Sequence, residues 1–111
     1  MRTLMISLVS DQTVPNVQLI NEFKSESVEF QFITTNAMEA KGCRKWIEAA
    51  AKITCAGEPI LVNEYSYDDI KQKLNSFDFS VYDKLIVNLT GGTKVMTIAA
   101  QEFFKEEGAD I

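Results

Sequence analysis

The stretch LIVNLTGGTKVMTIAAQEFF (residues 85–104) joins an apolar run to a segment whose apolar residues have helical spacing. The pair Gly91–Gly92 lies where a buried parallel strand would end and the next helix begin. Adjacent glycines accept positive φ angles and bring backbone N–H groups close to a ligand, and a helix N-terminus adds partial positive charge. The turn therefore predicts an anion site, to which Thr90 and Thr93 bring hydroxyls and Lys94 a cation.

Two common nucleotide-binding motifs do not fit the chain. A Walker A loop needs G-x-x-x-x-G-K-[ST], and the segment GGTK (91–94) has no earlier glycine at that spacing. The turn after the first predicted strand has no glycine and lacks G-x-G-x-x-G, which argues against NAD, NADP or FAD. A glycine turn that only allows tight packing of strand and helix is the alternative to an anion site.

Composition limits the chemistry of the chain. Its 111 residues fit one domain, 46% of them are hydrophobic, and the net charge of −5 gives no basic field for long nucleic acids. The sequence has no histidine, and Cys43 and Cys55 form no C-x-x-C pair. A zinc site, a histidine triad and histidine acid–base chemistry are therefore excluded within the chain, and we expect buried free thiols, no cofactor and no metal.

The sequence carries no sign of membrane contact. No apolar stretch approaches the roughly 20 residues that span a bilayer, and the first residues run into a strand-like segment without a signal-peptide cleavage site. We therefore expect a cytoplasmic protein without a membrane partner.

Strand and helix patterns alternate along the chain. They predict strands at residues 4–9, 28–35, 60–62 and 84–90, and helices at 15–23, 37–55, 67–77 and 93–107. The helix 37–55 is expected to be the longest, with Gly42 as a tolerated weak point. The alternation predicts a Rossmann-like α/β fold, a doubly wound parallel sheet with helices on both faces. Residues 108–111 resemble the start of another strand, so we expect an N-terminal domain of a longer protein.

In such sheets a ligand lies beyond the carboxyl ends of the strands, where the strand order reverses. For an order 3-2-1-4 that point lies between the first and fourth strands, so the loops Ser10–Asn16 and Thr90–Lys94 form the predicted site. The ligand-binding residues predicted in these loops are Ser10, Gln12, Thr13, Pro15, Asn16, Thr90, Gly91, Gly92, Thr93 and Lys94. Thr34, Thr35 and Asn36, at the end of the second strand, are the predicted pocket rim, with a plain turn as the alternative. We predict no catalytic residue.

The two loops resemble those of a known family. The segments LVSDQTVPN (8–16) and LTGGTKVM (89–96), with the motifs S-x-Q-T-x-P-N and T-G-G-T-K, are similar to the sensor domain of CRISPR-associated Rossmann-fold (CARF) proteins. They most resemble the branch in which this domain precedes a restriction-endonuclease-like nuclease domain. The resemblance covers essentially the whole chain in element order.

This resemblance implies a homodimer whose two domains form one symmetric pocket for a cyclic oligoadenylate, most often the tetra-adenylate ring, in type III CRISPR antiviral defence. It also implies that nucleic acid and a divalent metal are bound only by a nuclease domain outside this sequence. Gln12 and Asn16 would read adenine edges through their amides, or Asn16 would only cap its helix. For Trp46 we expect packing in the core or at the dimer contact.

Three functions stay open at this point. The first is an allosteric sensor that controls a nuclease. The second is a ring nuclease, in which Lys94 and the amides of Gly91–Gly92 stabilise charge while a ribose 2′-hydroxyl attacks the adjacent phosphate. The third is the sensor domain of a helix-turn-helix transcription regulator.

Overall fold

A parallel sheet forms the centre of the domain. The computed structural model of the chain describes residues 2–11, 13–89 and 93–106. Its four-stranded sheet has the order β3-β2-β1-β4, and all strand pairs are parallel. The strands are β1 (Thr3–Leu8), β2 (Val28–Thr34), β3 (Ile60–Leu61) and β4 (Lys84–Asn88). The predicted order 3-2-1-4 is confirmed.

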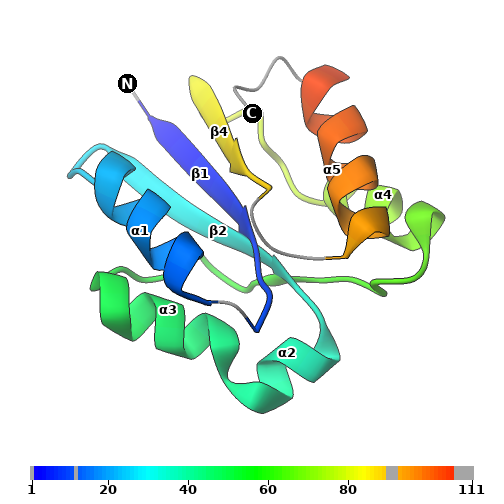
Figure 1. Cartoon of the computed structure of the whole chain (residues 1–111). Helices are drawn as coiled ribbons and strands as arrows, with labels where there is room; N and C mark the ends of the chain where they lie inside the picture. Colours follow the sequence, from blue (N-terminus) through cyan, green and yellow to red (C-terminus); the bar gives the residue numbers. More distant parts are fainter. Residues whose placement is uncertain (1, 12, 90–92, 107–111) are drawn as a thin grey trace.

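Helices cover both faces of the sheet, as a doubly wound fold requires. Figure 1 shows α1 and α3 on one face and α4 and α5 on the other. The described helices are α1 (Thr13–Phe23), α2 (Asn36–Lys41), α3 (Cys43–Ala51), α4 (Tyr67–Asn75) and α5 (Lys94–Glu106). The predicted Rossmann-like class is confirmed.

Alternate residues of β1 pack into two separate hydrophobic cores, one on each face of the sheet. Leu4, Ile6 and Leu8 are fully buried on the α4–α5 face, where they belong to a core that includes Phe104. Met5 points to the α1–α3 face and belongs to a second core with residues of those helices. Because fully burying one such side chain contributes about 1.5–3 kcal/mol, the apolar run of this strand, broken only by Ser7, holds both helical layers to the sheet.

The prediction of one long helix over residues 37–55 was wrong. Gly42 adopts the left-handed conformation with φ 74°, and its N–H closes α2 on the carbonyls of Met38 and Glu39. A new helix, α3, starts at the next residue and ends at Ala51, followed by the capping residue Lys52, which is also left-handed with φ 58°. Glycine takes this conformation without steric cost, so an apolar pattern that continues across Gly42 did not require a continuous helix. The longest helix of the described part of the chain is α5, with 13 residues.

Three other expectations concern single side chains and the membrane. Both cysteines are free, as predicted, but only Cys43 is buried, while Cys55 is half-buried. Burial raises the pKa of the Cys55 thiol to about 11. Trp46 is 51% exposed, so it does not belong to the core of this chain. Of the helices described here, none is long and apolar enough to cross a membrane.

Candidate ligand-binding site

The predicted site lies at the carboxyl edge of the two central strands. Ser7 of β1 is in register with Asn88 of β4, so the loops that follow these strands leave the same edge side by side. The expectation that the first and fourth strands are neighbours is therefore confirmed. Four of the predicted site residues, Gln12, Thr90, Gly91 and Gly92, lie outside the described residues.

A cavity of about 280 Å³ opens at this edge, and each strand of the sheet contributes to it through the segment that follows it. Of the predicted residues it is lined by Ser10, Thr35 and Thr93. It is also lined by residues that were not predicted: Val9, Asp11, Ala37, Met38, Glu64, Tyr65 and Met96. The structure thus brings the loops after β1 and β4 together with the start of α2 and the turn before α4.

Helix N-termini gather at the same edge because each helix after a parallel strand runs back antiparallel to it. The helices α1, α4 and α5 begin there, and each brings partial positive charge from its free backbone N–H groups. The Thr93 hydroxyl caps α5 by accepting a hydrogen bond from the N–H of Met96 at 3.2 Å. The Thr35 hydroxyl caps the short helix α2 by accepting from the N–H of Met38 at 3.2 Å. The hydroxyls of both threonines therefore fix the backbone that frames the cavity.

Asn16 lies under the site, fully buried. Its Nδ2 donates to the carbonyl of Leu8 at 3.0 Å, and its Oδ1 accepts from Nδ2 of Asn88 at 2.7 Å. Both ends of the amide are thus engaged inside the protein, and they join the first turn of α1 to the ends of β1 and β4. In this position Asn16 holds the two predicted loops next to each other.

The other predicted residues surround the cavity without lining it. Thr13 and Pro15 are half-buried in the first turn of α1, which begins two residues before the proline. Lys94 is the exposed first residue of α5. Asn36 is exposed at the start of α2 and lines a neighbouring cavity of about 560 Å³.

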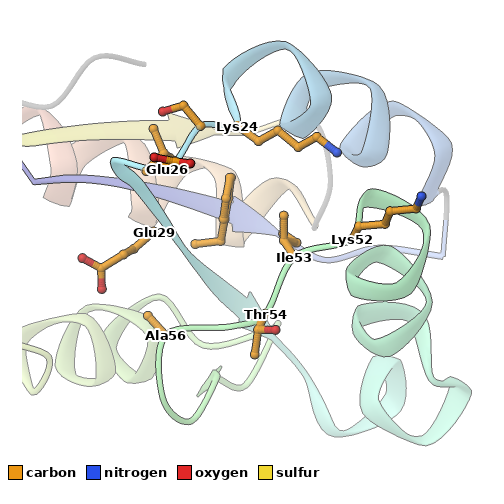
Figure 2. A pocket seen from close by; sticks show the side chains of 10 residues that line it. Lys24, Glu26, Glu29, Lys52, Ile53, Thr54 and Ala56 are labelled. Carbon is orange, nitrogen blue, oxygen red and sulfur yellow. The ribbon is translucent and has the colours of Figure 1, made fainter.

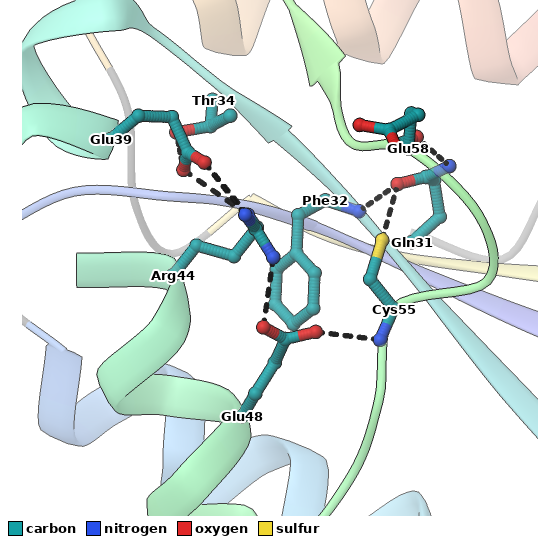
Figure 3. Close-up of polar contacts among 8 residues, drawn as sticks. All are labelled: Gln31, Phe32, Thr34, Glu39, Arg44, Glu48, Cys55 and Glu58. Atoms are coloured by element: carbon teal, nitrogen blue, oxygen red, sulfur yellow. Dashed lines mark hydrogen bonds and ion pairs between the residues drawn. The ribbon is translucent and has the colours of Figure 1, made fainter. Parts of the chain in front are cut away.

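An ion-pair network holds α2 at the site (Figure 3). Arg44 of α3 pairs with Glu39 of α2 at 2.8 Å and with Glu48 one turn further along α3 at 2.8 Å. The hydrogen bonds to Glu39 raise the pKa of Arg44 above its ordinary value. Glu39 also accepts a hydrogen bond from the hydroxyl of Thr34, which is fully buried and belongs to this network. The network therefore connects α2, across the break at Gly42, to both α3 and the end of β2.

Residues 63–66 form a turn that the sequence analysis did not assign to the site. The N–H of Asn63 donates to the Asp69 carboxylate at 2.8 Å, and its side-chain Oδ1 accepts from the N–H of Tyr65 at 3.0 Å. The Thr93 hydroxyl donates to the carbonyl of Glu64 at 2.9 Å and ties this turn to the loop before α5. The sequence does contain a pattern that could have located this turn. The capping pattern Ser66-x-x-Asp69 follows the apolar run 60–62 and predicts a turn at the same edge of the sheet.

A doubly wound sheet with a cavity of mixed apolar and polar lining at the point where its strand order reverses defines a Rossmann-like ligand-binding domain. A family model described as the Card1 CARF domain matches residues 4–111, and the chain belongs to this family. The CARF resemblance drawn from the two loop motifs is therefore confirmed.

Among solved structures, the fold is similar to that of Can2 from Sulfobacillus thermosulfidooxidans, determined in complex with cyclic tetra-adenylate. The two share 20% sequence identity with a TM-score of 0.77, and the match covers 97% of this chain. The chain spans 30% of the length of Can2. A sequence search of curated proteins finds no match.

Proposed function

We propose that this domain is a sensor that binds a cyclic oligoadenylate, with the ring of four adenylates as the preferred ligand. The observation that carries the proposal is the cavity at the carboxyl edge, to which the segments after all four strands contribute. Membership of the Card1 CARF domain family supports it, as does a shared fold with a protein that was solved with cyclic tetra-adenylate.

The charges around the cavity indicate how such a ring would be oriented. Asp11 and Glu64 line it, and Asp11 already pairs with Lys41 at 3.7 Å. Phosphates would be repelled by these carboxylates, so they would lie toward Lys94 and the N-terminus of α5. In the proposed complex Gly91 and Gly92 donate their backbone N–H groups there, as the sequence predicts.

The size of the cavity favours a homodimer. About 280 Å³ is just below the roughly 300–1,000 Å³ of pockets that hold drug-sized ligands, and a ring of four nucleotides is larger than such a ligand. Two copies related by a twofold axis would face each other across the ring and present each loop twice. We therefore propose that the ligand is shared between two protomers.

The proposed output is control of an effector domain. In this proposal the chain is the N-terminal sensor of a longer cytoplasmic protein, and ligand binding changes the activity of a nuclease domain that follows it. A divalent metal and nucleic acid would be bound by that domain.

Calorimetry on the 111-residue chain tests the ligand. We expect binding of cyclic tetra-adenylate with one ring per two chains, and weaker binding of rings of three or six adenylates and of linear tetra-adenylate. Light scattering of the complex should report a dimer. If none of the rings binds, the proposal is wrong.

The same samples distinguish a sensor from a ring nuclease. After incubation for hours, chromatography should recover the ring intact. Accumulation of linear oligoadenylate would contradict the passive sensor and favour the ring-cleaving alternative.

A further inference from the structure

Tyr65 is a large aromatic side chain held in solvent beside the ligand cavity. It is 81% exposed, the highest fraction among the large apolar and aromatic side chains of the described residues. Packing within this chain therefore gives no reason for an aromatic residue at this position.

The turn that carries Tyr65 is fixed from several sides. Asn63 accepts the backbone N–H of Tyr65, and the Asp69 carboxylate accepts the N–H of Asn63. Thr93 anchors the neighbouring carbonyl of Glu64. A ring on such a turn loses less conformational entropy on contact with a ligand than a ring on a loose loop would.

The position of the ring matches the proposed ligand. Tyr65 lines both the cavity of about 280 Å³ and the neighbouring cavity of about 560 Å³, so it lies between the two hollows of the carboxyl edge. Both cavities also contain Glu64 and Ala37. A planar group that enters either hollow would pass next to the Tyr65 ring.

The surroundings favour a nucleobase over a protein surface as the partner of this ring. Asn63, Glu64 and Asp69 line the larger cavity with it, together with the cation Lys73, and the centre of a protein interface is depleted of charged residues. An adenine base combines an apolar face with an amino group that donates hydrogen bonds, and carboxylate and amide oxygens accept such bonds. The acceptor-rich lining next to an exposed aromatic ring thus fits a base better than it fits a phosphate.

We propose that Tyr65 stacks on an adenine base of the bound ring and thereby strengthens its binding, an inference that rests on the proposed function. Because Thr93 joins the two elements, the base-stacking turn and the loop predicted to hold the phosphates would act as one unit.

Calorimetry with cyclic tetra-adenylate on the 111-residue chain and two Tyr65 variants tests the stacking. Tyr65→Ala removes one aromatic–base stack per protomer and so two per ring, each worth about 1–3 kcal/mol, and should bind at least roughly 30-fold more weakly. Tyr65→Phe keeps the ring and should stay within about threefold of the unchanged chain. Tyr67→Ala is the matched control, because Tyr67 is an exposed tyrosine on α4 whose hydroxyl donates to Glu102. The affinity of this variant for cyclic tetra-adenylate should equal that of the unchanged chain.

A fluorescence signal separates stacking from a structural role. In a Trp46→Phe background, which removes the single tryptophan, Tyr65→Trp should be quenched by cyclic tetra-adenylate with the dissociation constant found by calorimetry. Quenching is expected because an indole in contact with adenine loses fluorescence, whereas a distant one does not.

Two results would overturn the inference. They are unchanged affinity in Tyr65→Ala, or equal losses in the Ala and Phe variants. If the unchanged chain binds no ring at all, the proposed function fails and this inference with it. If the unchanged chain and Tyr65→Ala bind the ring equally well, the inference about Tyr65 is wrong and the proposed function still holds.

Discussion

The two edges of the sheet carry hollows that are framed by opposite ends of helices. Side-chain charge alone does not favour the proposed carboxyl-edge site, because Asp11 and Glu64 line its cavity whereas Lys24 and Lys52 line the groove at the amino edge. At the amino edge a groove of about 620 Å³ lies between the ends of α1 and α3 and the start of β2 (Figure 2). At the carboxyl edge the cavity lined by Thr93 and Tyr65 has about 280 Å³.

Helix direction explains the difference. Helices α1 and α3 end at the amino edge, and their last carbonyls bring partial negative charge. Lys24 donates to the carbonyl of Ala51 at 2.9 Å, so its ammonium group is already bound to a helix C-terminus. At the carboxyl edge α1, α4 and α5 begin, and their free N–H groups bring partial positive charge. We therefore place the proposed phosphate site by the polarity of the surrounding backbone and not by the volume of the hollow.

The largest expected effect is on affinity at the carboxyl edge. Lys94→Ala removes the predicted phosphate cation from each protomer, and a symmetric ring would lose two charge-assisted hydrogen bonds of about 1.5–3 kcal/mol each. We expect the affinity for cyclic tetra-adenylate to fall by at least about a hundredfold in calorimetry.

The control removes a cation from the amino edge. Lys52 lines the groove there and has φ 58°, so Lys52→Gly deletes the charge and also relieves a left-handed backbone. Its affinity should equal that of the unchanged chain. Equal losses in the two variants would show a general effect of net charge and contradict a site at one edge.

The next largest effect is on stability at the carboxyl edge. Asn16→Ala removes two buried hydrogen bonds and leaves the Leu8 carbonyl without that donor. Because each unsatisfied buried group costs about 1–3 kcal/mol, we expect the free energy of unfolding to fall by about 2–4 kcal/mol in urea denaturation. Asn75→Ala, at the exposed end of α4, should stay close to the unchanged chain. An Asn16 variant of normal stability would show that this amide does not hold the loops.

The sequence predicted the position of the site in the sheet, but it did not predict the role of Asn16. The strand order and the edge could be predicted, because polar loops follow two apolar runs and parallel strands direct their loops to one side. The burial of Asn16 could not be predicted, since an asparagine near a helix start has the same sequence pattern whether it caps the helix, contacts a ligand or bridges strands. That distinction depends on tertiary contacts with Leu8 and Asn88.

The sequence pattern also did not predict helix boundaries that depend on a single backbone angle. The apolar spacing of residues 37–55 continues across Gly42, and only its φ of 74° separates α2 from α3. Tyr65 was missed for a related reason, because the turn 63–66 has no repeating pattern and is defined by hydrogen bonds to Asp69 and Thr93.

A smaller effect is expected at Gly42, which separates α2 from α3. Gly42→Ala places a methyl group in open space, with no atom within 4 Å, but keeps a left-handed φ. The backbone alone should therefore cost about 1–2 kcal/mol of stability in urea denaturation. A variant as stable as the unchanged chain would mean that α2 and α3 can join into the single helix that the apolar pattern predicted.

The smallest expected effect lies on the amino-edge side, at Cys55. Its folded pKa is raised from 9.0 to about 11, chiefly by burial, so the folded state holds its proton more tightly than the unfolded state. This contribution to stability is complete below pH 9 and is lost as the pH rises toward 11. The stability difference between the unchanged chain and Cys55→Ala should therefore shrink over that range in urea denaturation. A difference that does not vary with pH would contradict the shift.

A titration of the isotope-labelled domain with cyclic tetra-adenylate, followed by amide NMR, tests the central comparison most directly. The account predicts that the signals of Ser10, Thr35, Tyr65 and Thr93 shift, while those of Lys24 and Thr54 in the amino-edge groove do not. Shifts confined to the amino-edge groove would contradict it.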